Sequence, residues 1–362
     1  MKTWRYERNR FLSEGSLPTW SDVPDDVRAF HRTLPGYNPT PLVELPVIAD
    51  SLGVRELRVK DESKRFALDA FKALGASYAI HRLLQAQGAR RSWTFCTATD
   101  GNHGRAVAWT ARRLGRKAVV FVPGNTVAAR ISAIEAEHAK VVVVKGTYDD
   151  AVREAARQAR AEGWEVVSDT AYVGGDMDIP RWIMEGYGTI FEELAEQAFA
   201  PDLILVQAGV GGLLCAATLW YKRHGASPNL VSVEPMAADC LLASIASPGG
   251  NIRSVRGRQN SIMAGLNCGT PSLLAWPVIR QGVHAFLAID DGFAIEAMKM
   301  YAKSGITSGE SGAAGLAGLI VLSREPSLAE ARRQLSFGVD TRVLLINTEG
   351  ATDPDHYRRL VS

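Results

Sequence analysis

The sequence lacks the features of a membrane protein, a disulfide scaffold or a nucleic-acid-binding protein. A membrane span needs about 18 uninterrupted apolar residues, and no stretch of the sequence is that long. The charged start MKTWRYERNRFLSEG lacks the apolar core of a signal peptide. The four cysteines lie far apart without a C-x-x-C pair, which argues against a zinc site or a disulfide framework. A net charge of +2 gives no reason to expect nucleic acid or a membrane surface as a partner. We therefore expect a cytoplasmic protein with reduced thiols.

What the sequence does contain is a repeated alternation of apolar strands and helices. With 362 residues and 46% hydrophobic residues, the chain can bury the cores of two domains. The alternation predicts parallel strands joined by helical crossovers. We expect a strand at 165–170, one long helix at 178–198, and an irregular start up to about residue 40 apart from a helical patch at 22–34. The predicted division is a discontinuous large domain, 1–89 and 176–362, and a small α/β domain, 90–175.

Lys72 stands in the apolar run RFALDAFKALGASYAI, residues 65–80, just before a helix predicted from Ala73 to Gln87. Desolvation disfavours the ammonium form of a lysine and leaves a nucleophilic amine, as a Schiff base with an aldehyde cofactor requires. A lysine that snorkels to water from a helix start is the alternative.

The stretch TATDGNHGRAVA, residues 97–108, lies at a predicted strand-to-helix junction. Its glycines let the backbone curl, and the helix start offers unpaired N–H groups to an anion such as a carboxylate. Asn102 could hydrogen-bond a phenolic oxygen. Asp100 is either a base, a partner for a cation, or the cap of the helix. His103 has no spaced partner that would complete a metal site, and we expect no metal.

A second glycine-rich turn, QAGVGGLLCAA at residues 207–217, joins a buried strand to a helix and suits a phosphate held on main-chain amides. The rival interpretation is a dinucleotide fingerprint with Glu234 as the ribose-binding acid. Leu214 occupies the place of its third glycine, which weakens that rival.

Two further residues end predicted strands: Thr348, which can point a hydroxyl into a pocket, and Asp169.

Together with MAGLNCG and SGESGAAG, these stretches resemble the motifs of fold type II pyridoxal-phosphate (PLP) enzymes and, within them, of the 2,3-diaminopropionate ammonia-lyase family. The likeness runs from about Thr40 to the end of the chain. It depends most on D-G-N-H-G, where threonine dehydratases have a small or hydroxyl residue in place of the aspartate, and on the ending T-E-G-x-T-D-P. The resemblance implies two open, mostly parallel sheets, as in the tryptophan synthase β subunit, and a homodimer that binds PLP and a small amino-acid substrate.

The resemblance also implies roles for individual residues. Lys72 would form the internal aldimine with PLP, Asn102 would contact its phenolic oxygen, and Thr348 would face its pyridine nitrogen. The phosphate would lie on the segment Gly209, Val210, Gly211, Gly212 and Leu213. Substrate would be bound by Thr99, Asp100, Gly101 and His103. Asp100 and Asp169 would handle the substrate's amino groups and take its α-proton. In this family the positions of Cys240 and Cys268 can lie close together.

The implied activity is α,β-elimination of 2,3-diaminopropionate to pyruvate and ammonia. A β-amine departs only when protonated, so a carboxylate at Asp100 favours a β-ammonium substrate. A PLP-dependent dehydratase of serine, threonine or a β-aryl serine is the alternative within the same class. Outside that class stand a nucleotide-binding oxidoreductase, which would show nicotinamide or flavin absorption, and a binding protein that holds cofactor but releases no ammonia.

Overall fold

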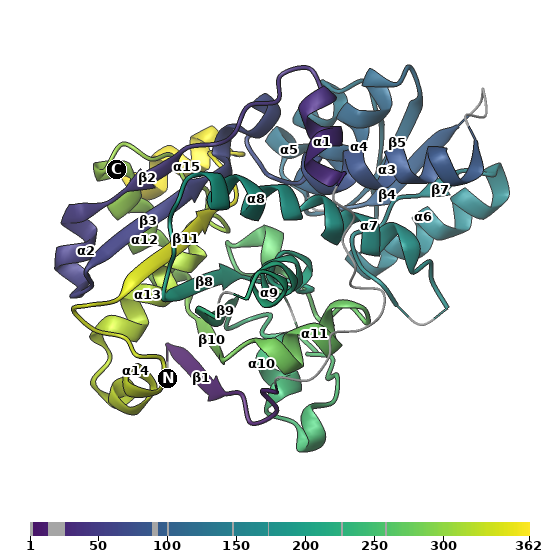
Figure 1. The fold of residues 1–362 in the computed structure, drawn as a ribbon. Coiled ribbons are helices and arrows are strands. Elements are labelled where there is room, and N and C mark those ends of the chain that lie inside the picture. The colour runs from purple at the N-terminus through teal and green to yellow at the C-terminus, as the bar shows by residue number, and fades with distance from the viewer. Residues whose placement is uncertain are drawn as a thin grey trace. The chain divides into compact units, whose positions relative to one another are not determined.

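The computed structural model describes residues 3–13, 26–88, 93–99, 101–146, 148–172, 174–225, 227–257 and 259–362. The chain divides into two compact units, each with its own sheet (Figure 1). Unit 1 comprises Met1–Val23, Pro39–Lys64 and Ile190–Ser362, and unit 2 comprises Pro24–Asn38 and Arg65–Thr189.

Unit 1 is organised around a seven-stranded sheet in the order β1-β10-β9-β8-β11-β3-β2. The five inner strands pair in parallel, whereas β1 and β2 pair antiparallel at the two edges. Its strands are β1 (Trp4–Arg8), β2 (Leu42–Glu44), β3 (Glu56–Asp61), β8 (Leu203–Gln207), β9 (Asn229–Pro235), β10 (Ala285–Ile289) and β11 (Arg342–Asn347). Every residue of β8 and β10 is buried, as expected for parallel strands with helices on both faces.

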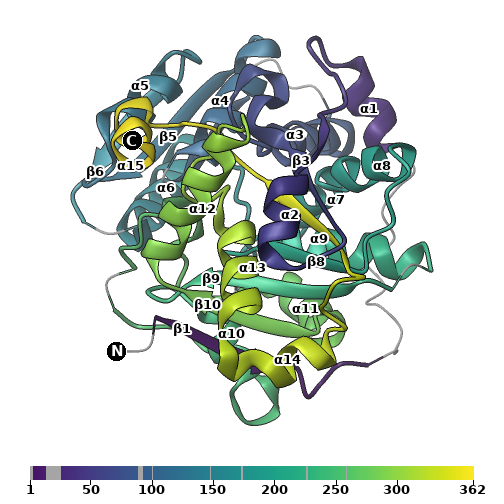
Figure 2. The same cartoon turned by 90° about the vertical axis from the view of Figure 1, so that its left-hand side faces the viewer.

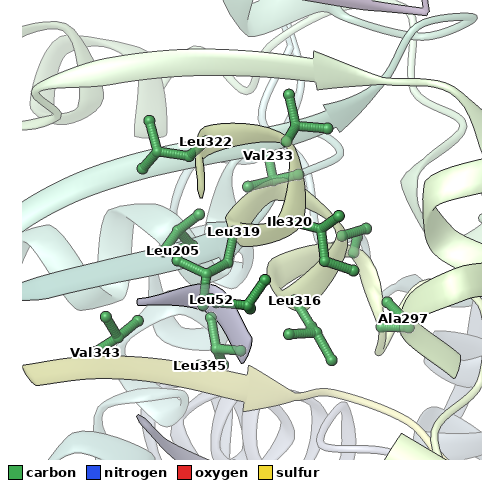
Figure 3. Close-up of a cluster of buried hydrophobic side chains, with 14 of the residues drawn as sticks. Leu52, Leu205, Val233, Ala297, Leu316, Leu319, Ile320, Leu322, Val343 and Leu345 are labelled. Atoms are coloured by element: carbon green, nitrogen blue, oxygen red, sulfur yellow. The ribbon is translucent and has the colours of Figure 1, made fainter. Parts of the chain in front are cut away.

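The helices of unit 1 cover both faces of this sheet. They include α2 (Pro46–Leu52), α9 (Gly212–Arg223), α10 (Cys240–Ile245), α11 (Ala275–Gly282), α12 (Asp291–Lys303), α13 (Ala314–Arg324), α14 (Ala329–Gln334) and α15 (Pro354–Val361). In Figure 2, α12 and α13 lie in front of the sheet. Val233 packs against α13 in the main hydrophobic core (Figure 3). Its neighbour Glu234 points to the opposite face and binds the start of α10, because side chains alternate along a strand.

Unit 2 contains a four-stranded parallel sheet in the order β6-β5-β4-β7. Its strands are β4 (Thr94–Ala98), β5 (Lys117–Pro123), β6 (Lys140–Val144) and β7 (Glu165–Val166). Its helices are α1 (Val27–Thr33), α3 (Ala73–Gln87), α4 (Asn102–Arg113), α5 (Ala128–Glu135), α6 (Tyr148–Glu162) and α7 (Asp178–Gly186). Phe121 of β5 packs with α6 and Val120 contacts the backbone of α4 at Gly104, so these helices cover opposite faces. The two sheets confirm the predicted α/β class with open, mostly parallel sheets.

Three expectations about single elements were wrong. The start of the chain is not irregular, because Trp4–Arg8 forms the edge strand β1. The long helix expected at 178–198 is divided at Tyr187 into α7 and α8 (Gly188–Glu196). The strand expected at 165–170 ends at Val166, because the next carbonyl, that of Val167, accepts a hydrogen bond from a histidine side chain.

The segment from 247 to 272 has no α-helix or strand in its described residues, as predicted. It contains two short 3-10 turns, Pro248–Gly250 and Ala264–Leu266. Across the described chain, no helix is both long and apolar enough to cross a membrane.

Candidate active site

Lys72 is the N-cap residue of α3, where the predicted helix begins. The chain approaches it through three residues with left-handed backbone angles: Phe66 at φ 53°, Ala67 at φ 60° and Asp69 at φ 55°. Such angles are uncommon for residues with a Cβ, and clusters of strained residues occur at functional sites. The lysine does not snorkel fully to water, since its side chain is only 22% exposed.

Asp169 is the direct partner of Lys72. Its Oδ2 lies 2.7 Å from Lys72 Nζ, and its side chain is 19% exposed. Burial alone would raise the pKa of Asp169, but the Lys72 ammonium, His103 and the hydrogen bonds to the carboxylate together hold that pKa well below its usual range. Asp169 is therefore an ionised carboxylate at neutral pH. Structure and sequence agree in bringing these two predicted residues together.

Tyr187, which sequence reasoning missed, also lies beside Lys72. Its ring centre lies 5.8 Å from Lys72 Nζ, and its hydroxyl is buried. Burial raises the pKa of Tyr187 to about 12, against the lowering effect of Lys72. The flanking Gly186 and Gly188 were the available signal, because Gly186 packs so tightly on α3 that a Cβ there would lie 2.6 Å from the Leu74 carbonyl oxygen.

The other predicted residues of unit 2 gather where β4 runs into α4. The Thr99 hydroxyl accepts hydrogen bonds from the N–H groups of Gly101 (3.0 Å) and Gly104 (3.3 Å), which fixes the turn. Gly101 has a φ of +153°, which side-chain-bearing residues rarely adopt. Asn102 is the first residue of α4 and the buried His103 the second. Asp100 lies outside the described residues, so its role stays a prediction.

His103 is held by a bond from its Nε2 to the carbonyl oxygen of Val167, 2.9 Å away. Its Nδ1 is buried and makes no hydrogen bond to any described residue. Burial lowers the pKa of His103, and so does Lys72, while Asp169 acts in the opposite direction. The ring is therefore neutral and belongs to the same cluster as Lys72 and Asp169.

The predicted phosphate segment in unit 1, Gly209 to Leu213, forms the turn from β8 into α9. Gly211 is the N-cap of α9 with φ +99°, and no side chain caps the helix. No backbone N–H from 209 to 213 donates to another described residue. Added Cβ atoms would fill the turn, at 2.8 Å from Cys268 Sγ for Gly209 and at 2.5 Å from Ile279 Cδ1 for Gly211. Free amides at a helix start form a ready site for a phosphate.

Thr348 follows β11 and is held by the amide of Gln207, whose role was also missed. Gln207 Nε2 lies 3.0 Å from Thr348 Oγ1 and 2.8 Å from the Ile346 carbonyl oxygen. An amide nitrogen only donates, so the Thr348 oxygen accepts there and its own proton remains available to another acceptor. The sequence signal was a polar residue at the end of an otherwise apolar strand.

Glu234 has no free carboxylate for a ribose. It is fully buried, and its oxygens accept hydrogen bonds from the N–H groups of Leu241 (2.7 Å) and Leu242 (2.8 Å). Burial raises its pKa to about 8 even though these bonds lower it. The dinucleotide interpretation therefore loses Glu234 as its ribose-binding acid.

Cys240 and Cys268, whose positions can lie close together in the family, are both free thiols in this structure.

These residues fit pyridoxal phosphate: an amine beside a carboxylate, an uncapped helix start that a Cβ would block, and a hydroxyl with a proton to donate. The chain belongs to the family of pyridoxal-phosphate dependent enzymes, whose family model matches residues 33–349. The structure has the fold type II architecture that the motifs implied.

Three comparisons with single proteins show where the chain lies within this family. The chain is 40% identical to the diaminopropionate ammonia-lyase of Escherichia coli (strain K12), over 98% of this chain and 95% of that protein. The crystal structure of the Escherichia coli lyase in complex with an aminoacrylate-PLP azomethine reaction intermediate matches with a TM-score of 0.90 and 37% identity, covering 99% of this chain and 96% of that one. An L-threonine dehydratase of Lactococcus lactis is 27% identical over 71% of this chain and 60% of that protein.

Proposed function

We propose that this chain is a PLP-dependent ammonia-lyase that eliminates ammonia from 2,3-diaminopropionate and yields pyruvate. The observation that carries the proposal is the Lys72 amine 2.7 Å from the ionised Asp169 carboxylate, within a chain 40% identical to a diaminopropionate ammonia-lyase. The weaker match to a threonine dehydratase makes a β-hydroxy amino acid the second candidate substrate.

Each cofactor-binding residue has one proposed task. Lys72 would hold the cofactor covalently through Nζ, and the amides from Gly209 to Leu213 would bind its phosphate at the positive end of the α9 dipole. Thr348 would donate its free proton to the pyridine nitrogen, which leaves the ring uncharged, and Asn102 would contact the phenolic oxygen. Once bound, pyridoxal phosphate withdraws electrons from the substrate's Cα and acidifies its proton.

The residues around α4 and Asp169 would handle the substrate. The first N–H groups of α4, with Thr99, Gly101 and His103, would bind its carboxylate. Asp169 would take the α-proton as an ionised carboxylate, and Asp100 would pair with the β-ammonium group. That pairing selects an amino leaving group, because a β-hydroxyl carries no charge for Asp100 to bind.

The proposal also covers the assembly, the location and the domain division of the protein. The family resemblance supports a homodimer, and the widely spaced free cysteines support a cytoplasmic location. The division into a discontinuous large PLP-binding domain, 1–89 with 176–362, and a small α/β domain, 90–175, stays a prediction. Gel filtration tests the homodimer, limited proteolysis tests the domain boundaries, and cell fractionation tests the location.

The test of function uses purified enzyme reconstituted with PLP. We expect an absorbance band at the violet edge of the visible range that changes on addition of D- or L-2,3-diaminopropionate, with release of pyruvate. Lys72→Ala should abolish both band and turnover, whereas Lys64→Ala, an exposed lysine on the same approach to α3, should keep them. Turnover of threonine alone would make the enzyme a dehydratase. Cofactor binding without ammonia release would leave a binding protein.

A further inference from the structure

The side-chain amide of Gln207 is held in one orientation by the oxygens around it. Gln207 is the last residue of β8 and is buried. Its Nε2 lies within hydrogen-bond distance of three main-chain carbonyl oxygens, those of Ile346 (2.8 Å), Ser311 (3.2 Å) and Gly312 (3.2 Å). A carbonyl oxygen only accepts, so the atom that faces these three oxygens is the amide nitrogen. The reverse orientation would place the amide oxygen against all three carbonyls, and the amide therefore stays as it is.

This orientation decides what the Thr348 hydroxyl can do. The same Nε2 lies 3.0 Å from Thr348 Oγ1. Because an amide nitrogen cannot accept, the threonine oxygen accepts there and its proton points elsewhere. That proton has no acceptor among the described residues, although Thr348 is only 4% exposed. A buried hydroxyl proton without an acceptor needs an explanation, and a ligand that brings an acceptor supplies one.

Two of the carbonyls that hold the amide belong to the motif SGESGAAG, and the residue next to Thr348 fixes that turn. Glu349 Oε1 accepts a hydrogen bond from the N–H of Ser311 at 3.0 Å. The main-chain oxygen of Glu349 accepts another from the N–H of Gly309, also at 3.0 Å. The S-G-E-S-G and N-T-E-G motifs thus meet in one buried hydrogen-bonded cluster around Gln207, within unit 1.

We infer that Gln207 is a positioning residue that fixes the Thr348 hydroxyl as a donor, so that the site accepts only the unprotonated form of the cofactor's pyridine nitrogen. This inference rests on the proposed function, in which Thr348 faces that nitrogen. A protonated ring nitrogen would bring its own N–H against the Thr348 proton, and two donors form no hydrogen bond. Gln207 acts here only through Thr348.

A double-mutant cycle on PLP binding separates this role from simple packing. Gln207→Met removes the amide and keeps a side chain of similar length, and Thr348→Val removes the hydroxyl. Packing makes the effect of Gln207→Met the same with and without Thr348→Val, whereas positioning makes that effect depend on the hydroxyl. The matched control is Gln197→Met, because Gln197 Nε2 also bonds a carbonyl oxygen, that of Thr40 at 2.9 Å, outside the proposed site.

The experiment titrates each apo-enzyme with PLP, followed by absorbance, and measures its melting temperature as a check of folding. We expect Gln207→Met to raise the Kd for PLP about five- to tenfold, which corresponds to one neutral hydrogen bond. Added to Thr348→Val, it should raise the Kd less than about twofold. Gln197→Met should bind PLP as the wild type does. Equal effects of Gln207→Met with and without Thr348→Val would overturn the inference and leave Gln207 a packing residue.

A second readout follows the ring proton itself. With PLP labelled with ¹⁵N in the pyridine ring, the nitrogen shift of the wild-type holoenzyme should be that of an unprotonated ring at neutral pH. In Gln207→Met the protonated ring should appear at a higher pH than in the wild type, because the hydroxyl is no longer fixed as a donor. A protonated ring in the wild type at neutral pH overturns the inference even if Gln207→Met does not fold, and so does the same titration in both proteins.

Neither readout needs turnover, so the inference and the proposed function fail in different experiments. A wild type that binds PLP but releases no pyruvate from 2,3-diaminopropionate overturns the proposed function. An active wild type in which Gln207→Met and Thr348→Val act independently on PLP binding overturns this inference alone.

Discussion

Replacing Gly211 with alanine tests whether the turn from 209 to 213 binds the cofactor phosphate. Gly211 has φ +99° and caps α9, and a left-handed backbone costs a residue with a Cβ about 1–2 kcal/mol. The new Cβ would also lie 2.5 Å from Ile279 Cδ1, and overpacking of this kind costs roughly 1–3 kcal/mol. The turn can relieve these costs only by rotating its N–H groups, which are the groups that would hold the phosphate.

The assay is a titration of the apo-enzyme with PLP, followed by absorbance. If relieving the strain weakens phosphate binding by about 2 kcal/mol, the Kd of Gly211→Ala for PLP rises about 30-fold. Each 1.4 kcal/mol of binding free energy changes the Kd about tenfold. Gly225→Ala is the matched control. Gly225 lies just beyond the other end of α9 with φ +64° and has nothing within 4 Å of an added Cβ, so it carries similar backbone strain without touching the proposed phosphate site.

The result that refutes this reasoning is a Gly211→Ala enzyme that binds PLP as tightly as Gly225→Ala while both melt at similar temperatures. The strain would then be absorbed without disturbing any group that contacts the cofactor. The phosphate would have to be held elsewhere, and the 209–213 segment would be only a tight connection between β8 and α9.

Three further predictions follow from the described contacts. Asp169→Asn should keep the cofactor band but lower kcat/KM by about 10²–10⁴-fold in steady-state pyruvate assays; unchanged kcat/KM would remove Asp169 as the base. Burial raises the pKa of Glu234 to about 8, so the folded state loses stability as pH rises from about 5 to 8; Glu234→Gln should flatten melting temperature over that range. Lys60→Met leaves the buried Glu193, whose Oε2 lies 2.7 Å from Lys60 Nζ, without that cation and should cost about 3–5 kcal/mol in urea unfolding; Lys60→Met with Glu193→Gln should recover part of it.

Much of the fold was predictable because parallel strands buried on both faces appear in the sequence as short apolar runs. LILVQ and VLLIN are such runs, and they form β8 and β11. The edge strand β1, WRYER, is half-exposed and pairs with β10 on one side only. It therefore carries charged residues and lacks the apolar run by which the other strands were predicted. Its pairing with β10 joins residues near 5 to residues near 288, and no local pattern carries that information.

The break at Tyr187 shows a second limit. The apolar periodicity continues through α7 and α8, so the sequence favours one helix. Tight packing decides otherwise: added Cβ atoms at Gly75 and Gly186 would lie 2.6 Å from Tyr187 Cε1 and from the Leu74 carbonyl oxygen, respectively. The glycines are therefore a sign of close approach between α3 and α7, and that approach brings the Tyr187 ring within 5.8 Å of Lys72 Nζ.

The chemistry of the proposed site depends on proton positions that residue identities do not reveal. His103 has a basic Nδ1 because its Nε2 donates to a carbonyl 64 residues along the chain. Thr348 can act as a donor because Gln207, 141 residues away, donates to its oxygen. Reversing either bond would turn the acceptor into a donor, or the donor into an acceptor, without changing a letter of the D-G-N-H-G or N-T-E-G motif. Motifs therefore locate the reacting groups, and the fold determines which of them can take or give a proton.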